Sequence, residues 1–234
     1  LKPFWLKRLL SAVCAWRPAC AARAQRHVGR RSCAVLVQRG PSGGPMDGCE
    51  SASEIIRGQL YLGNATDARE IGRGRNPWRI THVLNVSDAF VLPPGEAASG
   101  VVAEWVPIAD DGRDSVFGPE QTEAQYEAAL AADPAARPRG AWWRCRAFLA
   151  GALPPDAPVG HRRVLVHCAL GVNRSPTIVA AWLMDVWRWD SERAMRYIHK
   201  RRPVVNPVDE HLQQLAGFQQ QLGVAAQGGR CSLQ

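Results

Sequence analysis

One stretch of the chain combines a cysteine, a glycine and an arginine at spacings that could do chemistry. It is residues 164–178, VLVHCALGVNRSPTI, in which Cys168 ends an apolar run and Arg174 follows six residues later. If that run is a strand and a helix begins near Ser175, the loop between them turns backbone N–H groups inward. Gly171 supplies the conformational freedom that close backbone approach needs. The stretch therefore predicts a site for an anion.

The same positive surroundings would act on the Cys168 thiol. A free cysteine is only a few per cent thiolate at neutral pH, but near a helix N-terminus and an arginine its pKa falls to about 3.5–7.5. The Arg174 guanidinium can bind two oxygens of a phosphate-like group. We therefore expect phosphoryl transfer to sulfur followed by hydrolysis, with Ser175 donating a hydrogen bond to the departing sulfur. The competing interpretation of Cys168 is a small buried apolar side chain.

The rest of the sequence predicts one α/β domain that positions this loop. Runs of β-branched and apolar residues closed by turn formers predict strands at 58–64, 80–88, 101–111 and 161–168. Composition, caps and breakers predict helices at 119–132, 141–153, 175–187, 190–202 and 208–222. Strands mixed with helices, followed by a run of helices, indicate a central mixed β-sheet flanked by helices.

Local patterns also predict how three of these helices begin or pack. We expect Ser175 to cap the helix over 175–187, with Pro176 in its first turn, and Asp190 to cap the next helix. The helix over 175–187 is apolar nearly all round, which indicates burial on most sides. One face of the last helix is expected to be buried, formed by Leu212, Leu215, Phe218 and Leu222.

The net charge of +8 is concentrated near the N-terminus. Residues 1–45 carry nine Lys or Arg and no Asp or Glu, which leaves 20 basic and 21 acidic residues in the remainder. The part expected to fold is therefore nearly neutral, and we expect no nucleic-acid partner.

The seven cysteines include no C-x-x-C pair, so neither a disulfide framework nor a structural zinc is expected. No apolar run reaches the length of a membrane span.

The chain divides into three segments and one insertion. We expect residues 53–223 to form the folded domain, with 113–140 as an insertion and 224–234 as a tail. Residues 1–52 are a basic segment with two interpretations. The Arg-rich, acid-free composition of residues 1–45 is typical of a mitochondrial transit segment, whereas the first methionine, Met46, suggests an upstream stretch wrongly joined to the coding frame.

The nine residues from His167 to Ser175 resemble the H-C-x-x-G-x-x-R-[ST] signature of the cysteine-dependent protein tyrosine phosphatase superfamily. The continuation SPTIVAAWLM, together with GQLYLGNATDA, THVLNVSD and RRPVVNP, is similar to the dual-specificity branch of that superfamily. The resemblance implies a protein tyrosine phosphatase-like fold, no cofactor, and a supporting role for His167, which would orient and tune the loop. It also implies a phosphate-binding loop, which consists of Cys168, Ala169, Leu170, Gly171, Val172, Asn173 and Arg174.

The resemblance further implies a general acid on a separate loop, an aspartate that protonates the leaving oxygen and then activates water. A positioned acid is typically worth about 10²–10⁴ in rate. The candidates in IADDGRD are Asp110, Asp111 and Asp114. By position after VPIA the acid falls on Asp111, with Asp110 as the alternative.

Three features depart from the family pattern or remain open. The connection that includes 113–140 is longer than usual, and NPVDEHL lacks the Asn-x-Gly-Phe that commonly follows this proline. Residues 200–202, Lys-Arg-Arg, are interpreted as a solvated helix end, with substrate docking as the alternative.

The leading hypothesis is a small dual-specificity phosphatase acting on phosphotyrosine and phosphoserine or phosphothreonine in proteins, protein kinases among them. We expect no kinase-docking domain upstream of residue 54. A phosphoinositide, phospholipid or RNA 5′-phosphate substrate is the alternative, although residues 169–173 contain no Lys or Arg. A catalytically silent phosphoprotein-binding module is disfavoured because both Cys168 and Arg174 are present. We expect a cytoplasmic, also nuclear, location, or a mitochondrial one if 1–45 is a transit segment.

Overall fold

The structure is a computed structural model that describes residues 51–89, 100–133, 136–154 and 158–225. The basic segment up to residue 50 and residues 226–234 of the predicted tail lie outside this part of the chain. Within the described ranges, no helix is both long and apolar enough to cross a membrane. The fold described below belongs to the unit that begins at Met46.

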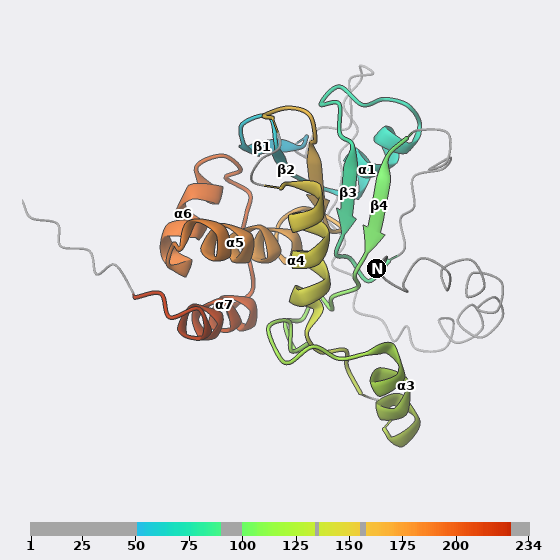
Figure 1. Ribbon diagram of the computed structural model, residues 1–234, viewed down its shortest axis with the longest axis vertical. Helices are drawn as coiled ribbons and strands as arrows, with labels where there is room; N and C mark the ends of the chain where they lie inside the picture. The colour runs from blue at the N-terminus through green and yellow to red at the C-terminus, as the bar shows by residue number, and fades with distance from the viewer. Residues whose placement is uncertain (1–50, 90–99, 134–135, 155–157, 226–234) are drawn as a thin grey trace, which may run out of the picture. The chain divides into compact units, whose positions relative to one another are not determined.

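The described residues form a five-stranded sheet in the order β1-β2-β5-β3-β4 (Figure 1). Its strands are β1 (Ser53–Ile56), β2 (Leu60–Gly63), β3 (His82–Asn85), β4 (Val102–Trp105) and β5 (Val164–His167). Strand β1 pairs with β2 antiparallel, and β2, β5, β3 and β4 pair with their neighbours in parallel. The mixed sheet predicted from the sequence is confirmed, and β5, which leads into the loop of interest, lies at its centre.

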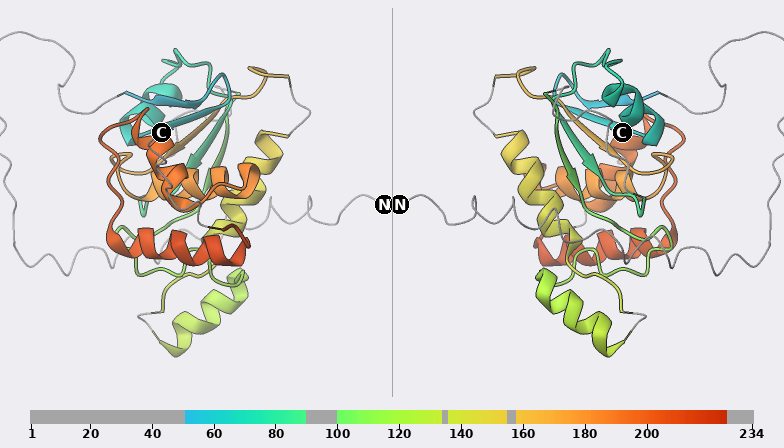
Figure 2. Two further views of the ribbon diagram at one scale, coloured as in Figure 1. Left: turned by 90° about the vertical axis from the view of Figure 1, so that its left-hand side faces the viewer. Right: turned by 90° about the vertical axis from the view of Figure 1, so that its right-hand side faces the viewer.

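Helices cover both faces of the sheet (Figure 2). The described helices are α1 (Ala65–Gly72), α3 (Glu123–Ala132), α4 (Ala141–Ala152), α5 (Arg174–Trp187), α6 (Ser191–His199) and α7 (Asp209–Gln221), of which α3 lies apart from the sheet. Successive residues of β5 pack on opposite faces of the sheet, because side chains along a strand point alternately to the two sides. Val164 and Val166 pack in the cluster that contains α5 and α7, whereas Leu165 packs against Ala68 and Ile71 of α1.

The expected strands and helices are present, and two elements were missed. These are the short strand β1 and helix α1, which begins with a capping box. Asn64 accepts hydrogen bonds from the backbone N–H groups of Thr66 and Asp67, and the Asp67 carboxylate accepts one from the N–H of Asn64. The N-x-x-D spacing of Asn64 and Asp67 was the signal for this helix start.

Of three predictions about helix starts, one is wrong and two are confirmed. Helix α5 begins at Arg174 with Asn173, not Ser175, at the N-cap position, although Pro176 lies in the first turn as expected. Asp190 caps α6 by accepting a hydrogen bond from the N–H of Arg193.

The prediction for the last helix is largely confirmed. Leu215 and Phe218 are buried and Leu222 is partly buried against the core, as expected, but Leu212 is exposed and His211 is buried in its place. Histidine counts as polar in a hydrophobicity pattern, so His211 was not assigned to the buried face.

The carboxyl ends of the parallel strands meet at one edge of the sheet. The register pairs Gly63 with His167, His167 with Asn85, and Asn85 with Trp105. The segments that follow β2, β5, β3 and β4 therefore lie side by side, at the edge where open α/β sheets bind ligands. This arrangement gathers the Cys168 loop, Asp88 after β3 and the predicted acid segment after β4.

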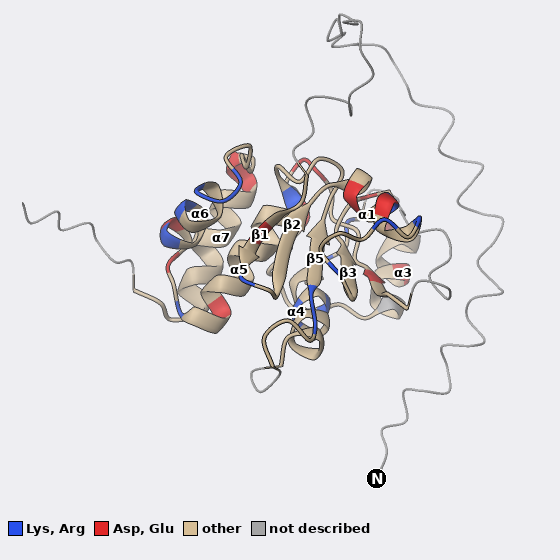
Figure 3. Ribbon diagram, turned by 90° about the horizontal axis from the view of Figure 1, so that it is seen from above, with Lys and Arg blue, Asp and Glu red and all other residues tan. Residues whose placement is uncertain are grey.

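The predicted insertion over 113–140 leaves this edge and returns to it. Ser115 and Arg139 form an isolated parallel bridge, and the helix between them, α3, lies away from the sheet (Figure 1). Acidic and basic residues share the same helices, as on α1 and α6 in Figure 3, which agrees with the nearly neutral composition of this unit.

Candidate active site

The loop from Cys168 to Asn173 is shaped by donors that hold its backbone carbonyls. The Cys168 carbonyl accepts from His167 Nδ1 at 3.1 Å, and the Ala169 carbonyl accepts from the N–H of Ala65 at 3.1 Å. The other donors, all outside residues 168–173, are Arg202 for Leu170 and Gly171, the N–H of Asn206 for Val172, and Thr177 for Asn173. The C=O and N–H groups of a peptide unit point in opposite directions. Because the carbonyls of this loop point outward to these donors, its N–H groups point inward, where they can bind an anion.

Cys168 lies inside this loop, almost completely buried. Its Sγ accepts hydrogen bonds from the backbone N–H of Gly171 and from the Ser175 hydroxyl, each at 3.3 Å. Burial opposes ionisation, but these hydrogen bonds, a further one from the Ser175 backbone and the Arg174 guanidinium outweigh it, so the pKa of the Cys168 thiol lies below its ordinary value. The pKa of the other described cysteine, Cys145, shifts in the opposite direction, because burial raises the pKa of that thiol.

Arg174 is 3% exposed and its guanidinium faces two carboxylates. Its Nη1 donates to Asp88 Oδ1 at 2.8 Å and to the carbonyl of Ile108 at 3.2 Å. Its Nε lies 2.8 Å from Asp110 Oδ1, but the N–H is misaligned with that oxygen and meets no hydrogen-bond partner among the described residues. The contact with Asp110 is therefore an ion pair without a hydrogen bond, and an incoming phosphate oxygen can take the Nε–H.

The three candidate aspartates have different surroundings. Asp110 contacts the phosphate loop, through Arg174 and through the Asn173 amide at 2.9 Å. Asp111 instead accepts two hydrogen bonds from Arg137, at 2.9 and 3.0 Å. Asp114 is buried and accepts from the backbone N–H of Ala109 at 2.6 Å.

The hydrogen bonds that Asp111 accepts come from Arg113 and Arg137 and not from the phosphate loop, although the resemblance implied Asp111 as the acid. The N–H of Arg113, together with Arg137, holds the pKa of Asp111 below its usual range, which stabilises the carboxylate and opposes proton donation. The prediction of the general acid passes to Asp110, the alternative.

His167 has the supporting position expected for it. It is completely buried, and its Nδ1 must carry the proton because the Cys168 carbonyl can only accept. Burial lowers the pKa of His167 to about 4, so the imidazole is neutral at pH 7. A neutral ring that donates to the carbonyl beside the nucleophile fixes the backbone at that point.

Arg202 is a supporting residue that the sequence interpretation missed. Lys200 and Arg201 are exposed as expected, but Arg202 is 1% exposed. Its Nε donates to the Gly171 carbonyl at 3.0 Å, and its Nη1 donates to the carbonyl of Ser51 at 2.9 Å. A solvated helix end is therefore wrong for Arg202, whose charge is used to hold the phosphate loop.

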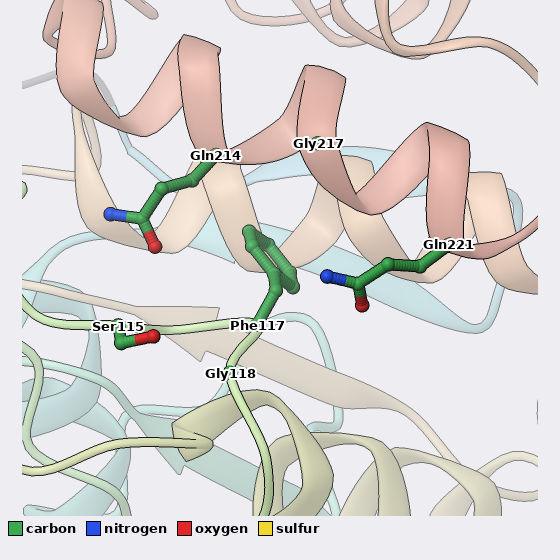
Figure 4. Close-up of a pocket in the computed structure, with 6 residues that line it drawn as sticks. All are labelled: Ser115, Phe117, Gly118, Gln214, Gly217 and Gln221. Carbon is green, nitrogen blue, oxygen red and sulfur yellow. The ribbon is translucent and has the colours of Figure 1, made fainter.

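A separate hollow of about 180 Å³ lies beside α7 (Figure 4). It is lined by Ser115, Phe117, Gly118, Gln214, Gly217 and Gln221. None of these residues belongs to the phosphate loop, so the hollow is not the Cys168 site. Within the described ranges, no group of three His, Cys, Asp or Glu side chains is placed to hold a metal ion.

A cysteine with a lowered pKa, a loop of inward N–H groups and an arginine at the start of the next helix together define a cysteine-dependent phosphatase site. Residues 156–221 match the family model described as dual specificity phosphatase, catalytic domain.

Two curated relatives illustrate how much of the chain is matched. The chain is 42% identical over 64 residues to protein phosphatase Slingshot homolog 3 of Mus musculus, which is 27% of this chain and 10% of that protein. It is 30% identical over 176 residues to dual specificity protein phosphatase Mpk3 of Drosophila melanogaster, which is 74% of this chain and 35% of that protein. The chain thus spans about a third or less of the length of these relatives.

Solved structures share the fold. The crystal structure of DUSP15 has a TM-score of 0.51 at 22% identity and matches 74% of this chain and 95% of its own. The structure of PTPMT1 in complex with PI(5)P has a TM-score of 0.51 at 20% identity and matches 74% and 97%. The family model and the Drosophila relative support the assignment of this chain to the dual-specificity phosphatases of the cysteine-dependent protein tyrosine phosphatase superfamily, and the solved structures show the fold alone.

Proposed function

We propose that this chain hydrolyses phosphotyrosine and phosphoserine or phosphothreonine in proteins, through a cysteinyl-phosphate intermediate. The observation that carries the proposal is the Cys168 thiol. It accepts hydrogen bonds from Ser175 and Gly171 inside the phosphate loop, whose carbonyls are held by donors outside the loop. A substrate phosphate would lie over the sulfur, bound by the inward N–H groups and by Arg174.

In the first step the Cys168 thiolate attacks phosphorus. The S–P bond forms while the bond from phosphorus to the leaving oxygen breaks, and the leaving oxygen takes a proton from Asp110. Without that proton the oxygen would depart as a strongly basic alkoxide or phenoxide, which is why a positioned acid contributes about 10²–10⁴ in rate. Asp110 is supported in this role by its place beside Asn173 and Arg174.

In the second step water attacks the phosphorus of the intermediate. The Asp110 carboxylate, now unprotonated, accepts a proton from the water, and the S–P bond breaks to release inorganic phosphate. The sulfur leaves as a thiolate, and the Ser175 hydroxyl at 3.3 Å stabilises it by donating a hydrogen bond.

The surface of the phosphate loop favours protein substrates. Leu170, at the rim of the loop, is 64% exposed, and no Lys or Arg lies in residues 169–173. An apolar rim suits the side chain that carries a phosphate in a protein, whereas a polyanionic lipid head group calls for additional cations near the first phosphate. The names of the relatives, a protein phosphatase and a dual specificity protein phosphatase, point the same way.

The test compares substrates and variants of the full chain. We expect turnover of 4-nitrophenyl phosphate that Cys168→Ser abolishes, and faster turnover of phosphopeptides than of soluble phosphoinositides. Turnover that survives Cys168→Ser would refute the mechanism. Phosphopeptide binding without turnover would identify a silent binding module, and a preference for phosphoinositides would reassign the substrate.

The assignment of Asp110 as the general acid is tested by replacing Asp110 and Asp111 separately, each variant being the matched control for the other. Asp110→Asn should lower kcat/KM for phenyl phosphate, a poor leaving group, by about 10²-fold or more, and for 4-nitrophenyl phosphate far less. Asp111→Asn should leave both values nearly unchanged, because that side chain faces Arg137. The reverse result would return the role to Asp111.

A further inference from the structure

The side chain of Asn173 is used in an unusual way for its position. Asparagine at a helix N-cap normally accepts hydrogen bonds from the first backbone N–H groups of its own helix. Asn173 makes no such bond within the part of the chain that the structure describes. Its Nδ2 instead donates to both the carbonyl and Oδ1 of Asp110, at 2.8 and 2.9 Å.

The other end of the same amide is held by the start of α7. Asn173 Oδ1 accepts from the backbone N–H of Val208 at 3.0 Å and from His211 Nδ1 at 2.8 Å. The Val208 N–H can only donate and the Asp110 carbonyl can only accept, so the orientation of the amide is fixed. His211 Nδ1 must then carry its proton. All four hydrogen-bonding capacities of the Asn173 amide are used, and they connect α7 to Asp110.

His211 is placed to serve this amide. It is completely buried, and its Nε2 meets no hydrogen-bond partner among the described residues. An apolar side chain would fill the position without leaving a polar atom unpaired, so the one contact that a histidine adds here is its bond to Asn173. Burial lowers its pKa; of the charged groups facing it, Asp110, Asp114 and Asp111 oppose this shift and Arg174 reinforces it.

Helix α7 also holds the segment that follows Asp110. Gln214 Nε2 donates to the Gly112 carbonyl at 2.7 Å, and its Oε1 accepts from the N–H of Val116 at 2.9 Å. Figure 4 shows Gln214 reaching from α7 toward the segment around Ser115. Gly112 has a φ of +70°, and a side chain there would collide with Glu210 of α7. The segment from Asp110 to Val116 is thus held on one side by Asn173 of the phosphate loop and on the other by Gln214 of α7.

We propose that Asn173 and His211 are positioning residues that hold Asp110 over the phosphate loop. The proposal rests on the proposed function, in which Asp110 is the general acid. The Asp110 side chain is 59% exposed, so packing alone does not restrict its rotamer. The Asn173 amide binds its backbone and its carboxylate together, and His211 prevents the amide from turning. Misplacing a reacting group by about 1 Å can cost a factor of about 100 in rate.

The experiment removes the His211 donor and then restores it. In His211→Leu the position stays apolar and loses the donor. In His211→Asn the side-chain amide nitrogen can occupy the place of Nδ1, and leucine and asparagine have the same branched shape. We measure kcat/KM for phenyl phosphate and for 4-nitrophenyl phosphate, because only the poor leaving group depends strongly on the acid.

We expect His211→Leu to lower kcat/KM for phenyl phosphate by about 10-fold, the equivalent of one hydrogen bond, and to change it little for 4-nitrophenyl phosphate. His211→Asn should recover most of the loss. The matched control is His199→Leu, at an exposed position on α6, which should affect neither substrate. In an Asp110→Asn background, His211→Leu should have no further effect, because the two changes act through one group.

Three results would overturn the proposal: an equal loss for both substrates, no recovery in His211→Asn, or an undiminished loss in the Asp110→Asn background. If Asp110→Asn is selective for the poor leaving group and His211→Leu is not, the positioning role fails while the proposed function stands. If Asp110→Asn itself lacks that selectivity, the acid assignment fails first. Should His211→Leu not fold, His211→Met, whose flexible apolar side chain also lacks the donor, takes its place and must show the same selectivity.

Discussion

Acidification should destabilise the fold through His167. The ring is buried and neutral, with a pKa lowered to about 4 by burial, against an ordinary value of 6.5 in the unfolded chain. Between these values the unfolded chain binds a proton that the folded chain does not. Stability therefore rises with pH across this window and is lost as the pH falls from about 6.5 toward 4.

The size of the effect follows from the shift. One pKa unit corresponds to about 1.4 kcal/mol, so a fall from pH 7 to pH 4.5 should cost about 2 to 3 kcal/mol through His167 alone. His167→Asn removes the titration and keeps an N–H near the position of Nδ1, so the hydrogen bond to the Cys168 carbonyl can persist. Carboxylates and other histidines titrate in both proteins, and their contributions cancel in the comparison.

The measurement is the free energy of unfolding in urea for the parent protein and for His167→Asn, at pH 7 and at pH 4.5. The advantage of the parent over the variant should shrink by about 2 to 3 kcal/mol, or change sign, at the lower pH. His199→Asn, at an exposed site, serves as the control and should show no such change. An advantage that is the same at both pH values would refute the buried neutral histidine.

Two further changes probe the loop itself. Arg202→Met leaves the Leu170 and Gly171 carbonyls without their donor, so we expect a loss of about 2 to 4 kcal/mol in urea unfolding. We also expect kcat/KM to fall by a similar factor for good and poor leaving groups. A selective loss for the poor one would argue against a role in shaping the loop. Gly171→Ala places a Cβ against the Gly63 carbonyl at a φ of +72°, so binding of inorganic phosphate, measured by calorimetry, should weaken by about 10-fold or more. Unchanged binding would contradict the close approach at this glycine.

The phosphate loop was predictable because its information is local. Strand, cysteine, glycine, arginine and helix start lie within fifteen residues, and the physical roles of these residue types follow from their spacing. Even there we expected the N-cap at Ser175, whereas the helix begins one residue after Asn173. Serine and asparagine both cap helices, so the residue types alone do not distinguish the two positions.

The general acid was harder because its choice depends on distant residues. Asp110 and Asp111 are neighbours of identical chemistry, and what distinguishes them is that Asn173, 63 positions away, contacts the first, whereas Arg137, 26 positions away, binds the second. His211 and Arg202 were missed for a related reason. A polar or charged residue in a predicted helix is normally interpreted as exposed, whereas both are buried here and donate to partners that only the fold brings near them.

The contact between Arg202 and Ser51 has a consequence for local unfolding. Strand β1 is a four-residue edge strand, of the kind that opens before the centre of a sheet. Arg202 donates from the same guanidinium to Ser51 and Ser53 at this edge and to Gly171 in the phosphate loop. Each opening of β1 removes acceptors from a buried cation and loosens its hold on the loop. Amide hydrogen exchange at this edge and the occupancy of the phosphate site are therefore thermodynamically linked: a bound anion should slow exchange in a strand that does not touch it.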